Sequence, residues 1–377
     1  MKNLLFKALI LLSILSTHAS CIQRGKPSMS EAGDTLQMKY ATLLHIVRYE
    51  DYTIVSIDNP WKEGKTLHKY VLLEKGRTPS AELPKGTVIL IPATKNVVFN
   101  TAHCQLMDWL GARSQLSGIT DLKYILVPFV KEGVSKGIIE DCGDGMSPVV
   151  EKIIDMKPDL IMLSPFENSG GYGRLDDINI PLVECADYME RSALARAEWM
   201  RFYGLLLGKS EEADSLFAIV DSSYNALKEL AKKSTDERSI LTEKLTGSTW
   251  YVPGGKSSIG GIISDANGTY PWKDDKHGGS LAMTFESVLD KAGNSDVWIF
   301  NYFGSGHLTY DQLSSEFQGY QEIKAFKTKE TWYVDTQRTP YFEEVSFRPD
   351  YLLRDYIILL HPTLGLGKPR YYTPVYN

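Results

Sequence analysis

Short apolar runs separated by turn-forming residues dominate the first half of the chain. Residues 40–58 and 68–74 are strand-like, and the turn-rich segment 59–64 between them predicts a hairpin. Further runs typical of buried strands lie at 88–91, 96–99, 124–127, 159–163 and 181–185. Helical spacing lies between these runs, at 101–110 and 151–156. Alternating strands and helices predict parallel βαβ units.

Residues 193–230 form an almost unbroken helical pattern. Apolar residues recur there at spacings of three and four: Trp199, Phe202, Tyr203 and Leu206, then Ala213, Leu216, Phe217, Val220, Tyr224 and Leu227. Gly208 is expected to end the first of these helices. A helical stretch between two α/β halves is a candidate connector, and the alternative is a pair of surface helices on one large sheet.

The second half repeats a pattern of the first. Residues 286–290 and 296–300 echo residues 151–155 and 159–163, each pair being a helix with Glu at its start, a turn, and a strand opened by Asp. The repetition predicts two similarly built lobes, and residues 350–361 add a last amphipathic helix. The expected fold class is α/β: two α/β lobes with central, mostly parallel sheets, joined by a long connecting α-helix.

The first twenty residues have the features of a secretory signal. Lys2 and Lys7 flank the start of an apolar run over residues 4–15, and small residues precede Cys21. The run is shorter than the roughly 20 apolar residues that span a bilayer. The site resembles the lipobox of bacterial lipoproteins, with His18 where that family usually has Leu, so lipid is expected on Cys21. The alternative is a plain secreted protein in which Cys21 is an ordinary thiol.

Composition is that of an ordinary globular protein, with 43% hydrophobic and 23% charged residues. Loss of Lys2 and Lys7 with the signal takes the net charge from −6 to about −8, which disfavours nucleic acid as a partner. Three cysteines, Cys104, Cys142 and Cys185, remain beside Cys21. One disulfide and one buried thiol are compatible with this odd set, and the sequence does not choose the pair.

No catalytic constellation is evident. The seven histidines have no zinc-ligand spacing, and no Gly-x-Ser-x-Gly elbow is present. The cluster Gly254-Gly255-Lys256-Ser257 lacks the first glycine of a phosphate loop, because Trp250 occupies that position. It is either a ligand loop or simply a turn. We expect no metal, no cofactor and no enzymatic activity.

Aromatic residues beside Gly, Pro or Asn are the more informative feature. They include Trp61, Tyr172, Trp250, Tyr251, Tyr270, Trp272, Tyr302, Phe303, Tyr341 and Phe342. Loops at the carboxyl ends of parallel strands bind ligands in open α/β sheets, and flat side chains there suit a bulky, ring-bearing ligand. Arg174, Arg338 and Lys256 are available for its acidic groups. The alternative for each aromatic residue is packing against its own domain.

Several segments together resemble the periplasmic substrate-binding proteins of ABC importers, in the branch for iron-siderophore, haem and cobalamin uptake. They are Lys-Pro-Asp-Leu-Ile within 151–163, Asp-Tyr-Met-Glu at 187–190, Ala-Arg-Ala-Glu-Trp at 195–199, Pro-Asp-Tyr-Leu-Leu at 349–353 and His-Pro at 361–362. The resemblance covers residues 40–362. It implies two α/β lobes joined by one long helix, here at 193–207, with ligand held between the lobes.

The resemblance also implies site residues and domains. Ligand contacts are expected at Trp61, His103, Tyr172, Trp250, Tyr251, Trp272, Tyr302, Arg338 and Tyr341. One acidic residue on each lobe should dock on the permease, and Glu167 and Glu286 are the candidates. The expected division is a signal peptide over 1–20, a flexible tether over 21–38, lobes over 39–190 and 210–377, and a connecting helix over 191–209.

The expected function is that of a monomeric, lipid-anchored substrate-binding component on the periplasmic side of a bacterial membrane. It would capture a metal chelate and deliver it to an ABC permease and its ATPase. An iron-siderophore is the first expectation, with haem or cobalamin as alternatives. An extracytoplasmic α/β enzyme and a surface-exposed scavenging lipoprotein are the other classes that the sequence leaves open.

Overall fold

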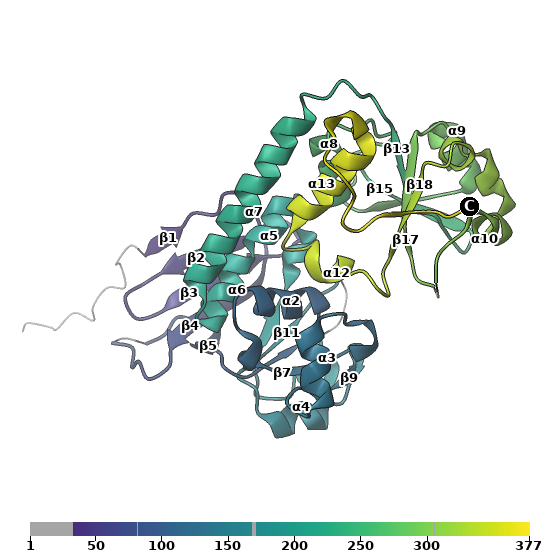
Figure 1. Ribbon diagram of the computed structural model, residues 1–377. Coiled ribbons are helices and arrows are strands. Elements are labelled where there is room, and N and C mark those ends of the chain that lie inside the picture. Colours follow the sequence, from purple (N-terminus) through teal and green to yellow (C-terminus); the bar gives the residue numbers. More distant parts are fainter. Residues whose placement is uncertain (1–32, 81, 168–170, 305) are drawn as a thin grey trace, which may run out of the picture. The chain divides into compact units, whose positions relative to one another are not determined.

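The computed structural model describes residues 33–80, 82–167, 171–304 and 306–377 (Figure 1). The predicted signal peptide, Cys21 and most of the predicted tether lie outside these residues. Asp34–Asn377 forms one folded unit. In the described part of the chain, no helix combines the length and apolar character needed to cross a bilayer.

A five-stranded sheet opens the described chain. It contains β1 (Asp34–Leu36), β2 (Leu44–Arg48), β3 (Thr53–Asp58), β4 (Thr66–Glu74) and β5 (Thr87–Ile91) in sequential order. The first four strands are antiparallel, and β5 runs parallel to β4. Alternate residues such as Val55 and Ile57 are buried, as the two-residue period of a strand requires. The predicted hairpin is confirmed as β3 and β4.

A parallel sheet follows, in the order β12-β11-β6-β7-β8. Its strands are β6 (Asn96–Val98), β7 (Leu116–Ile119), β8 (Glu140–Asp141), β11 (Leu160–Leu163) and β12 (Leu182–Glu184). The intervening helices are α2 (Thr101–Trp109), α3 (Pro128–Ser135) and α4 (Val150–Met156), and a small hairpin pairs β9 (Gly143–Asp144) with β10 (Ser147–Pro148). The strand order reverses between β6 and β11, which makes their carboxyl ends the expected ligand-binding edge.

The prediction of a strand over 124–127 is wrong. Tyr124 ends a short 3-10 helix, residues 125–127 form a loop that leads into Pro128, the first residue of α3, and the strand of this region is β7. Ile125 and Val127 are nevertheless buried. A short apolar run indicates that its side chains are buried, but it does not by itself distinguish a strand from a buried loop.

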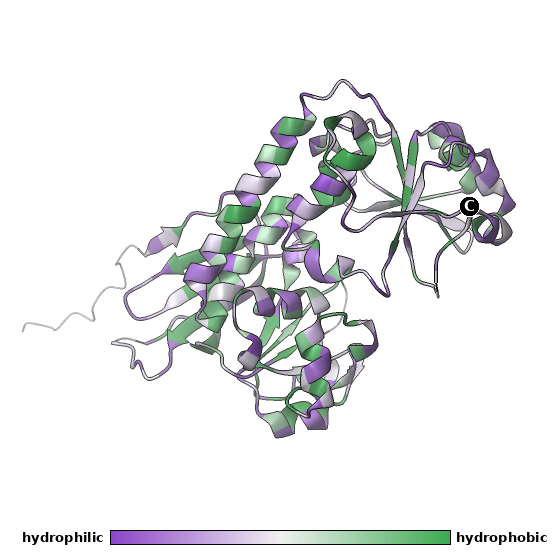
Figure 2. Cartoon of the chain, in the orientation of Figure 1, coloured by the Kyte–Doolittle hydropathy of each residue, from purple (hydrophilic) through white to green (hydrophobic). Residues whose placement is uncertain are grey.

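The helical stretch consists of α5 (Ala193–Glu198), α6 (Met200–Leu207) and α7 (Ser210–Ala231). The single helix expected over 193–207 is therefore divided at Trp199, and Gly208 ends α6 with a φ of 65°. The 22-residue α7 is the longest helix in the described residues and packs against α6 and α13 (Pro349–Leu360) (Figure 1). Figure 2 shows hydrophobic and hydrophilic bands alternating along α7. This amphipathic pattern gives α7 apolar residues that pack against the other two helices.

The second half contains two sheets. Strands β13 (Ile240–Thr242), β17 (Val297–Tyr302) and β18 (Thr331–Asp335) are parallel and β19 (Thr373–Pro374) is antiparallel. Strands β14 (Leu245–Thr246), β15 (Thr249–Pro253) and β16 (Ser280–Met283) form an antiparallel sheet. The helices are α8 (Ser258–Asp265), α9 (Phe285–Ala292), α10 (Tyr310–Glu316), α11 (Lys324–Lys327) and α12 (Tyr341–Glu344).

The predicted fold class of two α/β regions is confirmed, as is the repeated unit, since α9 and β17 correspond to α4 and β11. The long helix of this fold is α7, which begins just after the segment expected to connect the lobes. The domain boundaries at 190 and 209 remain a prediction.

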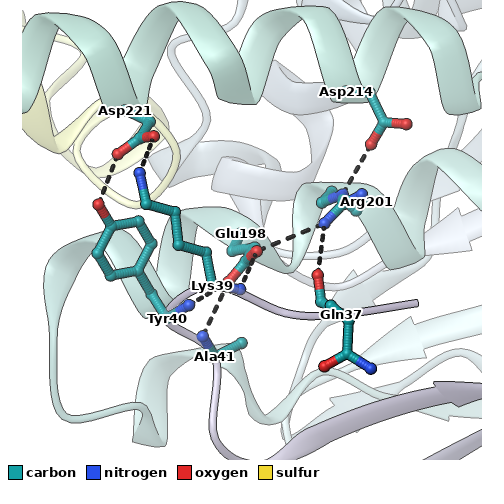
Figure 3. Close-up of polar contacts among 8 residues, drawn as sticks. All are labelled: Gln37, Lys39, Tyr40, Ala41, Glu198, Arg201, Asp214 and Asp221. Carbon is teal, nitrogen blue, oxygen red and sulfur yellow. Dashed lines mark hydrogen bonds and ion pairs between the residues drawn. The ribbon is translucent and has the colours of Figure 1, made fainter. Parts of the chain in front are cut away.

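Residues 39–41, between β1 and β2, are held against the helices by two carboxylates, of which Glu198 is buried and Asp221 partly exposed (Figure 3). Glu198 in α5 accepts hydrogen bonds of 2.7–2.9 Å from the backbone amides of Lys39, Tyr40 and Ala41. Asp221 in α7 accepts from the Lys39 ammonium and the Tyr40 hydroxyl, both at 2.6 Å. The segment that follows β1 is thus joined to α5 and α7.

Candidate functional site

A cavity of about 500 Å³ lies where the carboxyl ends of the two parallel sheets meet. The first half contributes residues that follow β6 and β7, and the second half contributes residues that follow β13, end β17 or belong to α8 and α12. This central cavity is lined by Phe99, Asn100, Thr101, Thr120, Asp121, Tyr124, Ile125, Arg196, Glu243, Ser258, Ile259, Asn301, Tyr341, Phe342, Val345 and Ser346.

Two further cavities share lining residues with the central one. A cavity of about 570 Å³ at the first sheet shares Phe99 and Asp121 and adds the segment after β11, including Phe166. A cavity of about 490 Å³ shares Tyr124 and adds residues after β17 and β18. The three cavities therefore form one cleft, which combines the carboxyl ends of both parallel sheets, where open α/β sheets bind ligands.

Exposed aromatic side chains gather in this cleft. The exposed fractions are 54% for Tyr124, 47% for Phe166, 63% for Phe303 and 50% for Phe342. The rings of Tyr124 and Phe303 meet edge to face with centroids 6.2 Å apart, although they come from different halves of the chain. Aromatic surface of this kind in a concave site is typical of a ligand-binding cleft.

Glu243 is the most unusual polar residue of the cleft. It directly follows β13 in a left-handed conformation with φ 64°, which is strained for a residue other than glycine. Burial raises the pKa of its carboxyl to about 7. Among the described residues its carboxylate has no hydrogen-bond or ion-pair partner, although Arg196 and Tyr341 line the same cavity.

Of Arg196 and Tyr341, which line the cavity with Glu243, Arg196 already pairs with another carboxylate. Arg196 lies with its Nε 3.1 Å from a carboxylate oxygen of buried Asp187. Burial would raise the pKa of Asp187, but the neighbouring His103 and Arg196 hold it below its ordinary value. Burial raises the pKa of the Tyr341 hydroxyl, and the Glu243 carboxylate raises it further. The base of the cleft therefore presents an acceptor that a ligand donor can engage.

Three of the sequence-predicted ligand residues line the cleft. Tyr341 lies in the central cavity, Tyr172 in the cavity at the first sheet, and Tyr302 in the cavity that includes Phe303. The Tyr172 hydroxyl donates a 2.7 Å hydrogen bond to Glu184. The structure thus brings these three residues together in one cleft.

The expectation that Trp250 and Trp272 are loop residues available to a ligand is wrong. Trp250 lies in β15 with no exposed surface, donates a 2.9 Å hydrogen bond from Nε1 to the Thr242 carbonyl, and packs 5.8 Å from Trp298. Trp272 is 3% exposed and packs on Tyr270. Both side chains are core residues, because the strands and turns beside them fold over the indole rings.

The other predicted ligand residues lie outside the three cavities formed by the described residues. Tyr251 alternates with Trp250 on β15 and is 47% exposed, and Trp61 occupies the turn between β3 and β4. His103 is buried in α2, with Nε2 3.2 Å from Asp187 but without hydrogen-bond geometry. Arg338 is exposed and paired with Asp335.

Sequence reasoning missed several cleft residues that share one signal. Phe99 follows β6, Asp121 follows β7, Glu243 follows β13, and Asn301 lies at the end of β17. Each stands at the carboxyl end of a parallel strand. A search for residues at the carboxyl ends of the predicted strands, rather than for aromatic residues near turns, would have found them.

Other expectations about surface and sulfur chemistry can be compared with the structure. Glu167, after β11, and Glu286, in the first turn of α9, are both exposed. Cys104, Cys142 and Cys185 are buried free thiols, so no disulfide pairs them. In the described ranges, no group of three or more His, Cys, Asp or Glu side chains is placed to hold a metal ion.

Comparisons with known proteins agree with this geometry. An uncharacterized lipoprotein of Methanocaldococcus jannaschii is 23% identical over 415 residues, which cover 100% of this chain and 97% of that protein. A periplasmic heme binding protein from Pseudomonas aeruginosa has a TM-score of 0.59 at 12% identity, covering 76% of this chain and 99% of the other. The periplasmic vitamin B12 binding protein of Vibrio cholerae has a TM-score of 0.53 at 12% identity, covering 73% of this chain and 98% of the other.

The profile of the family described as periplasmic binding protein matches residues 131–337, more than half of the chain. The match begins in α3 and ends just after β18, so it includes strands and helices of both α/β regions and most of the cleft. The family consists of binding proteins of transport systems rather than enzymes. The sequence, the fold and the cleft agree on one conclusion: this chain belongs to the periplasmic binding protein family.

Proposed function

We propose that the cleft captures a metal chelate and that the protein delivers it to the permease and ATPase of an ABC importer. The observation that carries this proposal is the group of exposed aromatic side chains at the carboxyl ends of two parallel sheets. Two proteins of similar fold are described as binders of heme and of vitamin B12, and a third is described as an ABC-type Fe3+-hydroxamate transport system. An iron-siderophore is our first candidate, with haem and cobalamin as alternatives.

Capture in this proposal involves no covalent chemistry. Phe303, Phe342 and Tyr124 supply flat apolar surface, and Glu243 and Asn301 supply polar contacts that orient the ligand. Affinity arises from burial of ring surface and from the prior organisation of the cleft by the two sheets. The packing of α7 against both α6 and α13 limits how far the two halves can move apart.

Visible absorption tests the ligand directly. The purified protein would be titrated with a ferric siderophore, haem and cobalamin, each of which absorbs in the visible. We expect one of the three to bind with one-to-one stoichiometry and a shifted spectrum. Absence of binding by all three would contradict the proposal, and conversion of a chelate to product would favour an enzyme instead.

Delivery requires a docking surface for the permease. We propose Glu167 and Glu286 for this role because both are exposed and each belongs to a different α/β region. Charge reversal to Lys at either position should lower uptake of the chelate by cells while leaving chelate affinity of the purified protein unchanged. A matched control is Glu322→Lys on another exposed surface. Normal uptake by both docking variants would exclude these residues.

We also propose that lipid on Cys21 anchors the protein on the periplasmic side of the membrane. The signal-like residues before Cys21 and the lipoprotein names of two relatives support this. The lipid would keep the binder near its permease and raise the local encounter rate. Cys21→Ser should release the protein into the soluble periplasmic fraction. Retention of the variant in membranes would contradict lipidation at this position.

A further inference from the structure

A further cavity, of about 790 Å³ and separate from the cleft, is lined by four cationic side chains. Arg191, Lys256, Lys273 and Lys276 line it, together with one carboxylate, Asp265. The remaining lining residues are small or uncharged: Gly255, Ser257, Gly260, Gly261, Ser264, Asn267, Gly268, Tyr270 and Gly278. We call this space the lysine cavity.

The charges of the lysine cavity are not neutralised by the protein. None of its four cations forms an ion pair within 4.0 Å with a carboxylate of the described residues. Asp265 is already paired, 2.6 Å from the Lys228 ammonium, and accepts a 2.8 Å hydrogen bond from Tyr224. The chain as a whole carries a net charge of −6, so four unpaired cations in one concavity are a local departure from its charge balance.

Close backbone packing joins the two segments that carry the lysines. A Cβ on Gly255 would lie 2.5 Å from the carbonyl oxygens of Trp272 and Lys273, and one on Gly260 would lie 2.5 Å from the Gly254 carbonyl. The loop before α8 therefore packs directly against the turn after Tyr270, and only glycine allows this approach. Lys256 comes from the loop, and Lys273 and Lys276 come from the turn and the residues after it.

The start of α8 lies between the lysine cavity and the cleft. Ser257 caps α8 and lines the lysine cavity, whereas Ser258 and Ile259 line the central cavity. The amino-terminal end of the eight-residue α8 adds partial positive charge at this boundary. A ligand arm that reaches from the cleft into the lysine cavity would pass the start of α8.

We infer that the lysine cavity is an oxyanion subsite that binds a carboxylate or phosphate arm of the captured chelate. The inference rests on the proposed function and narrows the ligand class to acidic chelates. The volume suits a small molecule or part of one, within the usual range of about 300–1,000 Å³ for ligand sites. Arg191 can bind such a group through two nitrogen atoms, and the three lysines act as point charges.

The experiment compares chelates with and without acidic arms. The full chain would be titrated with ferric citrate, with haem, which carries two carboxylates, and with an uncharged ferric trihydroxamate. Replacing Lys256, Lys273 and Lys276 by Ser should weaken binding of the acidic chelates by about tenfold or more. Replacing the exposed Lys62, Lys136 and Lys327 by Ser makes the same change in net charge elsewhere and should leave affinity within about twofold.

A steric variant separates the cavity from its charge. Gly261 lies in α8 and faces open space, with no atom within 4 Å of an added Cβ. Gly261→Phe should fill the lysine cavity and weaken acidic chelates while all four cations remain, whereas Gly261→Ala should bind as the parent does. Inorganic pyrophosphate should compete with acidic chelates and not with the uncharged one.

The outcomes are distinct. Acidic chelates that bind the lysine variant and Gly261→Phe as tightly as the parent would overturn the subsite while leaving the proposed function intact. Binding of pyrophosphate without any effect on chelate affinity would show a site for free anions only and would also overturn it. Failure of every chelate to bind the parent would overturn the proposed function and the assignment of this cavity to a chelate arm.

Discussion

The carboxylate of Glu343 in α12 accepts a 2.9 Å hydrogen bond from the hydroxyl of Thr101 in α2, 242 residues earlier in the chain. The same oxygen accepts the backbone amide of Leu126 at 3.0 Å. Glu343 is only 2% exposed, so its carboxylate, rather than water, accepts the hydrogen bonds of both donors. One buried carboxylate thus joins the two halves of the chain beside the cleft.

We expect Glu343→Ala to lower the free energy of unfolding by about 2–4 kcal/mol, because two donors lose their acceptor. Glu343→Gln keeps one carbonyl oxygen and similar volume, so its loss should be about 1 kcal/mol. Urea denaturation measures both values. Equal stabilities of the two variants would show that the hydrogen bonds to this carboxylate contribute little.

Adjacent residues on β15 provide a matched pair. Trp250 is fully buried and Tyr251 is 47% exposed. Trp250→Ala should destabilise the protein by about 3–5 kcal/mol through the cavity that it creates. Tyr251→Ala should change stability by less than about 0.5 kcal/mol. Guanidinium denaturation distinguishes them, and a Trp250→Ala variant as stable as the parent would contradict its placement in the core.

The raised pKa of the Glu243 carboxyl predicts that the free energy of unfolding depends on pH. Its carboxyl titrates at about 7 in the folded protein and near the ordinary value of 4.5 when unfolded. The folded state therefore holds this proton more tightly, so the contribution of Glu243 to stability is greatest below pH 4.5 and is lost as the pH rises through 7. Glu243→Gln removes this titration and should be more stable than the parent at pH 8 by about 2–3 kcal/mol.

Denaturation of the parent and the Glu243→Gln variant at pH 4 and pH 8 measures this difference. Glu286→Gln, which removes an exposed carboxylate, serves as the control. Parallel stability profiles of the parent and Glu243→Gln across this range would contradict the prediction.

The exposed aromatic residues of the cleft should act in binding rather than in stability. Phe303→Ala and Phe342→Ala should each weaken chelate affinity by about 1–2 kcal/mol, or roughly 5- to 30-fold, through lost stacking and burial. Their stabilities should stay within about 0.5 kcal/mol of the parent. Tyr251→Ala removes an exposed aromatic side chain outside the cleft and is the control. Unchanged affinity in both phenylalanine variants would place the ligand elsewhere.

Local pattern was sufficient for much of the secondary structure. The helix expected over 101–110 is α2, those over 151–156 and 286–290 are α4 and α9, and the run at 296–300 begins β17. These elements were predictable because their apolar spacing and stop signals are local. The strand expected over 124–127 was not, because a buried loop has the same apolar composition as a short strand.

The sequence by itself determined that the chain alternates strand and helix, repeats one unit in each half, and resembles periplasmic binding proteins. It also determined that aromatic residues stand near many turns. It did not determine which of these aromatic residues a ligand can reach. Trp250 and Tyr251 are neighbours in sequence, yet successive strand residues face opposite sides, and only the packing of the second half decides which side is the core.

The cleft itself was decided by tertiary structure. Its central cavity brings Phe99, Glu243 and Tyr341 together from strand ends and a helix that are far apart in the chain. The lysine cavity likewise unites Arg191 with a loop and a turn more than 60 residues later. A sequence pattern describes neighbours along the chain, whereas a binding site consists of neighbours in space, which the pairing of strands and the packing of helices create.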